Sequence, residues 1–214
     1  MHLFTTLILL SVLPGLFWVW YFARQDREQE PLFMLLRTFI VGALAVVPTI
    51  FLEMPLRHYL LSEHRLLVLI GLLAVGLIEE GVKLLAAYKA AFTSPHFNEA
   101  SDGIIYAITA ALGFAAAENI FYTINFGAQV AVIRSVVTSL AHASFSGIFG
   151  VAAGRVRMGQ GTRASIFKAF IAAALLHSFY DFIVIAHVLP PMFALVLIYI
   201  VYRYVTVQLR QAKA

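Results

Sequence analysis

Apolar runs long enough to cross a lipid bilayer recur along the whole chain. An α-helix needs roughly 20 apolar residues to span the hydrocarbon. Hydrophobic residues make up 62% of the 214 residues and charged residues 12%, whereas a soluble domain is about half apolar and about a quarter charged. The sequence therefore predicts an all-α polytopic membrane helix bundle of about seven transmembrane helices, at 3–23, 32–52, 66–91, 103–124, 130–153, 165–188 and 191–208.

The loops between these runs predict the topology. Each is too short for a core of its own, so we expect a single integral membrane domain, 1–214. Basic residues in 154–163 and in the C-terminal tail favour the cytoplasm. Counting back, 24–31 and 92–102 are also cytoplasmic, the N-terminus is outside and the C-terminus is cytoplasmic. The net charge of +4 then follows from topology, and we expect the bilayer, but no nucleic acid, as a partner.

Ionisable residues inside the predicted spans are the main functional signal. A charge at mid-bilayer costs about 2.5–3.5 kcal/mol on insertion scales, so such groups face the bundle interior and commonly mark function. Those in this chain are Glu79, Glu80, Lys83, Glu118, His142, His177 and Asp181.

Helical spacing brings several of these groups onto common faces. Lys83 lies three and four residues after the two adjacent glutamates, so it can reach either carboxylate, and His177 lies four residues before Asp181. With about 1.5 Å of rise per residue, the groups lie about 10–20 Å from the outer ends of their spans. Four helices are therefore predicted to bring acids and histidines to one level, which indicates a site.

The residue types and their spacing fit three kinds of site. A buried carboxylate can activate water for peptide hydrolysis, with a histidine as donor to the oxyanion. Two histidines with carboxylates can ligate zinc, although the chain has no HExxH sequence. Chains of intramembrane Glu, Asp and His also serve as proton or cation relays in transporters. Composition and spacing leave these alternatives open.

Four sequence strings together resemble the motif set of the PrsW family of intramembrane proteases, which is related to the CAAX prenyl endopeptidases. They are EEGVK at 79–83, FAAAEN at 114–119, SLAHASFSG around His142, and HSFYD at 177–181. The segment DGIIYAITAALGFAAAENIFY, 102–122, is particularly similar, and the resemblance extends over about 66–188.

The resemblance implies roles for individual residues. Glu79 would be the base that activates water, Glu80 would be held by Lys83, and His177 with Asp181 would stabilise the oxyanion. Glu118 stands where the CAAX proteases have a histidine, and His142 is a candidate for the missing imidazole. Asn119 and Asp102 are supporting residues, although Asp102 is expected chiefly as an N-cap at the start of a span. The favoured mechanism requires no cofactor; if zinc is bound, the candidate ligands are Glu79, Glu118, His142 and His177.

The resemblance also implies a substrate and a location. We expect an intramembrane endopeptidase in a bacterial cytoplasmic membrane, cutting membrane-anchored single-span proteins such as an anti-sigma factor on the extracytoplasmic side. The alternative is a proton- or cation-coupled transporter that uses the same buried cluster, and a non-catalytic scaffold is a third reading. Glu53 and Arg57, four residues apart, are expected to form an ion pair at the membrane interface.

Overall fold

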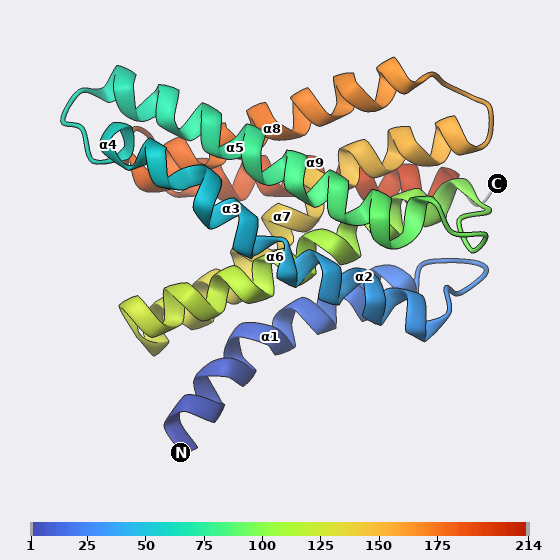
Figure 1. Ribbon diagram of the computed structural model, residues 1–214, viewed down its shortest axis with the longest axis horizontal. Helices are drawn as coiled ribbons and strands as arrows, with labels where there is room; N and C mark the ends of the chain where they lie inside the picture. The colour runs from blue at the N-terminus through green and yellow to red at the C-terminus, as the bar shows by residue number, and fades with distance from the viewer. Residues whose placement is uncertain (1, 213–214) are drawn as a thin grey trace.

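The chain folds into an all-helical bundle over the residues that the structure describes (Figure 1). The structure is a computed structural model that describes the backbone of residues 2–212 and the side chains of this range except 2–4, 7, 126 and 128–133. The longer helices are α1 (His2–Ala23), α2 (Leu32–Leu44), α5 (Arg65–Ala87), α6 (Ala100–Phe126), α7 (Ala128–Arg157), α8 (Arg163–Ile185) and α9 (Met192–Gln211). The shorter ones are α3 (Val46–Glu53), the 3₁₀ turn η1 (Met54–Leu56), α4 (Arg57–Leu60) and the π-helical η2 (Tyr88–Phe92).

The second predicted span is divided into two helices. α2 ends at Leu44 and α3 begins at Val46, with Ala45 between them. Pro48 lies in the first turn of α3. Because proline has no backbone N–H, it cannot bond to the carbonyl of Leu44, and its ring crowds that carbonyl. The chain bends at this point, and α3 passes over the middle of the bundle towards α4 (Figure 1).

α6 and α7 form the centre of the bundle. α6 contacts α1, α2 and α7, and its residues 104–112 are almost completely buried. Glycines allow the two central backbones to approach closely: a Cβ at Gly103 would lie 2.5 Å from the backbone nitrogen of Gly154, and one at Gly150 would lie 2.6 Å from the carbonyl oxygen of Gly103. Small residues at such crossings are typical of packed membrane helices.

A second close approach joins α5 to α8. A Cβ at Gly76 would lie 2.7 Å from the carbonyl oxygen of Ala174 and 2.2 Å from the Oγ of Ser178. Glu79 and Glu80 follow one turn after Gly76, and His177 directly precedes Ser178. The crossing at Gly76 therefore brings the paired glutamates of α5 against the histidine of α8.

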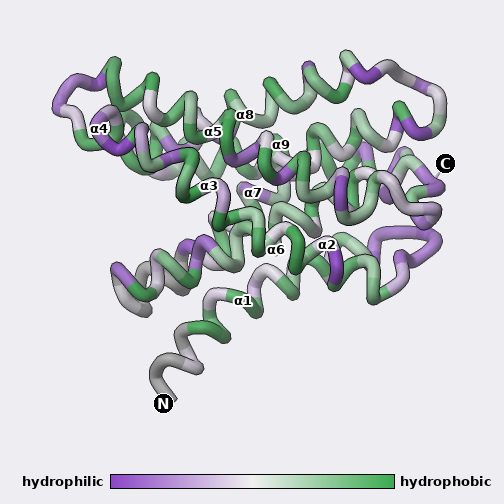
Figure 2. Tube along the Cα trace, in the orientation of Figure 1, coloured by the Kyte–Doolittle hydropathy of each residue, from purple (hydrophilic) through white to green (hydrophobic). Residues whose placement is uncertain are grey.

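The arrangement of the helices agrees with an integral membrane protein. Within the described residues, five helical segments are long and apolar enough to cross a membrane: Leu32–Leu60, Ala100–Asn125, Arg134–Arg157, Arg163–Ile185 and Met192–Gln211. α1 contributes a shorter apolar helix, Ile8–Ala23, and α5 carries three of the buried charges. Hydrophobic residues dominate the helices, and hydrophilic residues are most frequent in the loops (Figure 2). The count of seven spans stays a prediction.

The loops alternate between the two ends of the bundle. The α1–α2, α5–α6 and α7–α8 connections and the C-terminus lie at one end, whereas α4 and the α6–α7 connection lie at the other (Figure 1). The sequence predicts the same grouping. Which of these ends faces the cytoplasm stays a prediction.

Candidate functional site

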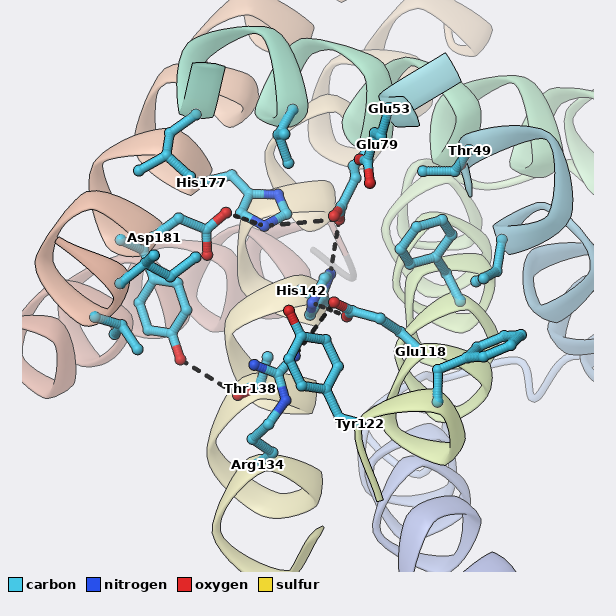
Figure 3. Close-up of a pocket in the computed structure, with 18 of the residues that line it drawn as sticks. Thr49, Glu53, Glu79, Glu118, Tyr122, Arg134, Thr138, His142, His177 and Asp181 are labelled. Atoms are coloured by element: carbon cyan, nitrogen blue, oxygen red, sulfur yellow. Dashed lines mark hydrogen bonds and ion pairs between the residues drawn. The ribbon is translucent and has the colours of Figure 1, made fainter. Parts of the chain in front are cut away.

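A cavity of about 320 Å³ opens between the helices towards the end of the bundle that carries α4. Five helices supply its chemically active side chains, and Figure 3 shows them directed towards a common space. The polar and charged residues that line the cavity are Thr49 and Glu53 from α3, Glu79 from α5, Glu118 and Tyr122 from α6, Arg134, Thr138 and His142 from α7, and His177, Tyr180 and Asp181 from α8.

Glu80 lies behind the cavity wall in a fully buried network. Its Oε1 accepts hydrogen bonds from the Nζ of Lys83 at 2.9 Å and from the Nδ1 of His177 at 2.8 Å. Its Oε2 accepts one from the Oγ of Ser146 at 2.6 Å. Three donors from three helices thus satisfy a carboxylate that has no access to solvent. This arrangement suits a residue that holds its neighbours in place.

Glu79, the other member of the pair, lines the cavity. Its Oε2 accepts a hydrogen bond from Lys83 at 2.9 Å and lies 3.7 Å from the Nε2 of His177 and 3.9 Å from the Nδ1 of His142. Lys83 therefore binds both glutamates at the same distance, whereas the resemblance assigned it to Glu80. The two glutamates differ in their exposure to the cavity, because Glu79 lines it and Glu80 does not.

His177 is oriented by Glu80 rather than by Asp181 alone. Its Nδ1 donates to Glu80, and its Nε2 lies 3.4 Å from the Oδ2 of Asp181. The ring also stacks on Phe145 at a centroid distance of 5.6 Å. These contacts direct Nε2 towards the cavity, between Glu79 and Asp181 (Figure 3).

Glu118, His142 and Arg134 form the opposite wall. The Nε2 of His142 lies 3.1 Å from a carboxylate oxygen of Glu118, and its Nδ1 lies 2.7 Å from the Nζ of Lys83. The Nη2 of Arg134 donates to Glu118 at 3.2 Å. The guanidinium group also lies 3.5 Å from the centroid of the Tyr122 ring, an arrangement that favours a fixed cation. His142 thus contacts both Glu118 and the Glu79–Lys83 pair, as its predicted depth suggested.

Two predicted supporting residues lie outside the cavity lining. Asn119 is buried and donates from Nδ2 to the Oγ of Ser139 on α7 at 3.3 Å. Asp102 lies at the cytoplasmic-side end predicted for α6, where its Oδ2 accepts the backbone N–H groups of Asn98 and Glu99. The expectation that Asp102 is the N-cap is wrong, because Glu99 is the N-cap and Asp102 is its partner at the third helical position in a capping box.

Two charged residues of the cavity lining had no predicted role in the site. Glu53 was expected to pair with Arg57, but among the described residues no ion pair includes either of them, and Glu53 lines the cavity while Arg57 is exposed. Arg134 lies within the predicted span 130–153, but no role in the site was predicted for it. Its position inside a membrane helix is the signal that identifies it as an interior group.

Comparison with known proteins places the chain in a family. The sequence model described as "PrsW family intramembrane metalloprotease" matches residues 30–207. The chain belongs to the PrsW family of intramembrane proteases. It is 35% identical over 190 residues to Protease PrsW of Clostridioides difficile (strain 630), a match that covers 83% of this chain and 78% of that protein.

Further PrsW proteases are similar over most of their length. The chain is 32% identical over 186 residues to Protease PrsW of Geobacillus kaustophilus (strain HTA426), covering 85% of this chain and 80% of the relative. It is 31% identical over 183 residues to that of Bacillus subtilis (strain 168), covering 82% and 81%. No solved structure matches the chain. As a PrsW-family member with several helices capable of spanning a membrane, the protein is an integral membrane protein, and these matches do not favour the transporter alternative.

The description of the PrsW family names a metal, and the donor atoms of the cavity suit one. One ligand atom each from Glu79, His142 and His177 lie within 4.8 Å of one another. The separations of 3.7 and 3.9 Å from Glu79 to the two rings are close to the roughly 3.3 Å between neighbouring ligands of a tetrahedral zinc ion. His177 also has the carboxylate partner at its second nitrogen that metal-binding histidines commonly have. Glu118, the fourth predicted ligand, instead contacts the far nitrogen of His142.

Proposed function

We propose that the cavity hydrolyses peptide bonds of membrane-anchored proteins, with Glu79 as the base that activates water. The observation that carries this proposal is the contrast between the two adjacent glutamates. Glu80 uses both oxygens to accept three hydrogen bonds and does not line the cavity, whereas Glu79 faces the cavity and, among the described residues, accepts a hydrogen bond from Lys83 alone. A carboxylate with free lone pairs in a cavity can take a proton from water, and one surrounded by donors cannot.

In the proposed reaction, the oxygen of water attacks the carbonyl carbon of the scissile bond while its proton passes to Glu79. His177 lies 3.7 Å from this carboxylate, and a hydrogen on its Nε2 would point into the cavity towards the developing oxyanion. The protonated Glu79 then returns a proton to the leaving amine. Lys83 holds the two glutamates and His142 together by one ammonium group, which keeps the base in position through this cycle.

A zinc ion fits the same wall. Glu79, His142 and His177 would hold it, and Lys83 would give up its contact with the Nδ1 of His142. When bound, such an ion would make water a stronger nucleophile and polarise the scissile carbonyl. The roles of Glu80 in orienting His177 and of Glu118 in orienting His142 are the same with and without the ion.

The substrates that we propose are single-span membrane proteins, anti-sigma factors among them, cut near the extracytoplasmic surface. The cavity lies towards the end of the bundle opposite the basic α7–α8 loop and C-terminus. Under the positive-inside rule those basic segments are cytoplasmic. A cavity placed in this way would receive a peptide segment that enters or leaves the outer surface of the membrane.

The experiment that tests the function is cleavage by purified protein in lipid vesicles. Wild type, Glu79→Gln and a matched control, Glu63→Gln, are incubated with single-span proteins, and new N-termini are mapped. Glu63 is exposed in the loop before α5, so its variant should behave as wild type. We expect cleavage to fall by at least ~1000-fold in Glu79→Gln, since the base is removed. Full activity of Glu79→Gln in stably folded protein would refute the assignment, and parallel runs with a chelator report on the metal.

A further inference from the structure

Four carboxylates line the cavity, and three of them have a basic neighbour. Glu79 lies 2.9 Å from Lys83, Glu118 lies 3.2 Å from Arg134, and Asp181 lies 3.4 Å from His177. Glu53 is the fourth. Among the described residues no ion pair includes it, and its Oε1 is buried without a hydrogen-bond partner. The cavity therefore contains one carboxylate that has no basic partner among the described residues.

Glu53 lies on the inward face of α3, which continues the buried face of α2. Val46, Thr49 and Ile50 line the cavity together with Glu53, and their spacing places them on one face of α3. The opposite face carries Val47, Phe51 and Leu52, which are all exposed. Figure 3 shows the Glu53 side chain descending from α3 at the edge of the cavity, near Glu79. α3 thus directs its one acidic side chain to the site.

We propose that Glu53 forms a specificity subsite that receives a basic side chain, Lys or Arg, of the substrate within a few residues of the scissile bond. This inference rests on the proposed function. Keeping a partly buried carboxylate ionised without a counter-charge is unfavourable, and a substrate cation would remove that cost on binding. Since the lining carboxylates outnumber the one lining guanidinium group, which is already held by Glu118, the field of the cavity also attracts a cation and repels an acidic side chain.

The test is a charge exchange between enzyme and substrate. A single-span substrate that the wild type cleaves is changed to Lys, Gln or Glu at each of the three positions on either side of the mapped cut. Each version is assayed with wild type, Glu53→Gln, Glu53→Lys and the control Glu63→Lys. Glu63→Lys makes the same charge change in an exposed loop at the same end of the molecule. Thermal unfolding of every variant identifies any that fail to fold.

We expect at least one position where wild type and Glu63→Lys prefer Lys to Glu by about tenfold or more in kcat/KM. Glu53→Gln should lose this preference, and Glu53→Lys should reverse it, while cleavage of the Gln version persists in all four proteins. If folded Glu53 variants keep the wild-type preference at every position, the subsite is refuted although the protease stands. If wild type cleaves no substrate, the proposed function fails as well, so the two failures are distinguishable.

Discussion

At the scale of single residues, the two adjacent glutamates have different environments. Their substitution should therefore have different effects on stability and activity. Glu80 is fully buried and accepts hydrogen bonds from three side chains, whereas Glu79 faces the cavity. Removing one charge from a buried ion pair costs about 3–5 kcal/mol because its partner is left uncompensated. We therefore expect Glu80→Gln to lower both the unfolding temperature and the activity.

Glu79→Gln should lose activity with a smaller loss of stability, because its side chain is the less enclosed of the two. Ser146→Ala, which removes one of the three donors to Glu80, provides the intermediate case, with about 1.5–3 kcal/mol lost. Thermal unfolding in detergent, measured beside the cleavage assay, distinguishes these outcomes. Equal destabilisation by the two glutamine variants would contradict the division of roles.

The residues of the site could be predicted individually from the sequence, but several of their pairings could not. Charged groups and histidines inside apolar runs stand out because burying them is costly, and all seven that were named from the sequence meet at the cavity or directly behind it. For His177 the structure shows another partner than the sequence suggested. The i,i+4 spacing pointed to Asp181, whereas Glu80 on another helix makes the shorter contact. Spacing reports neighbours on one helix, and it contains no information about which helices cross.

At the scale of helices, the crossing of α5 and α8 at Gly76 positions the site. A Cβ at Gly76 would lie 2.7 Å from the backbone oxygen of Ala174, too close without a shift of one helix. Gly76→Ala should therefore move α5 away from α8, lengthen the Glu80–His177 contact, and destabilise the fold by about 1–3 kcal/mol.

Gly81→Ala is the matched control on the same helix, because its Cβ would meet only the Phe170 ring at 3.6 Å, an ordinary contact. Unfolding temperature and cleavage rate of the two alanine variants test this prediction. It fails if Gly76→Ala is as stable and as active as Gly81→Ala.

Acidic residues of the α1–α2 connection lie against an acidic residue at the start of α6. Their closeness and burial make the stability of this contact depend on pH. One oxygen each from Asp26, Glu30 and Asp102 lie within 4.8 Å of one another. Burial raises the pKa of Asp26 to about 6 and that of Glu30 from 4.5 to about 8. A raised pKa means that the folded state holds more protons than the unfolded state, so the contribution of Glu30 to stability is greatest below pH 4.5 and falls as the pH rises towards 8.

Glu30→Gln cannot ionise, so its unfolding temperature should exceed that of wild type increasingly from pH 5 to pH 8. Gln can still accept the hydrogen bond that the Tyr106 hydroxyl donates to Glu30. The exposed Glu28 on the same loop offers the control Glu28→Gln, which should follow the wild-type curve. Parallel curves for wild type and Glu30→Gln would show that this group does not hold the proton.

At the scale of the whole molecule, the apolar runs predicted an all-helical bundle because a helix satisfies every backbone hydrogen bond within itself inside a bilayer. They also predicted which loops share an end of the bundle. Run length did not reveal the break between α2 and α3, because Pro48 interrupts the hydrogen bonds without reducing the hydropathy. Glu53 was missed for a different reason: i,i+4 spacing suggested Arg57 as its partner, whereas the structure places Glu53 in the cavity lining.

The orientation of the bundle can be measured because the chain contains no cysteine. Single cysteines are introduced by Gln160→Cys, in the α7–α8 loop, and by Glu63→Cys, in the loop before α5, and both positions are exposed. We expect a membrane-impermeant maleimide to label Glu63→Cys in intact spheroplasts and Gln160→Cys only after lysis, because the basic α7–α8 loop remains cytoplasmic. The unaltered chain supplies the blank. The reverse labelling pattern would place the cavity towards the cytoplasm, and the substrate would then have to be sought among proteins cut on that side.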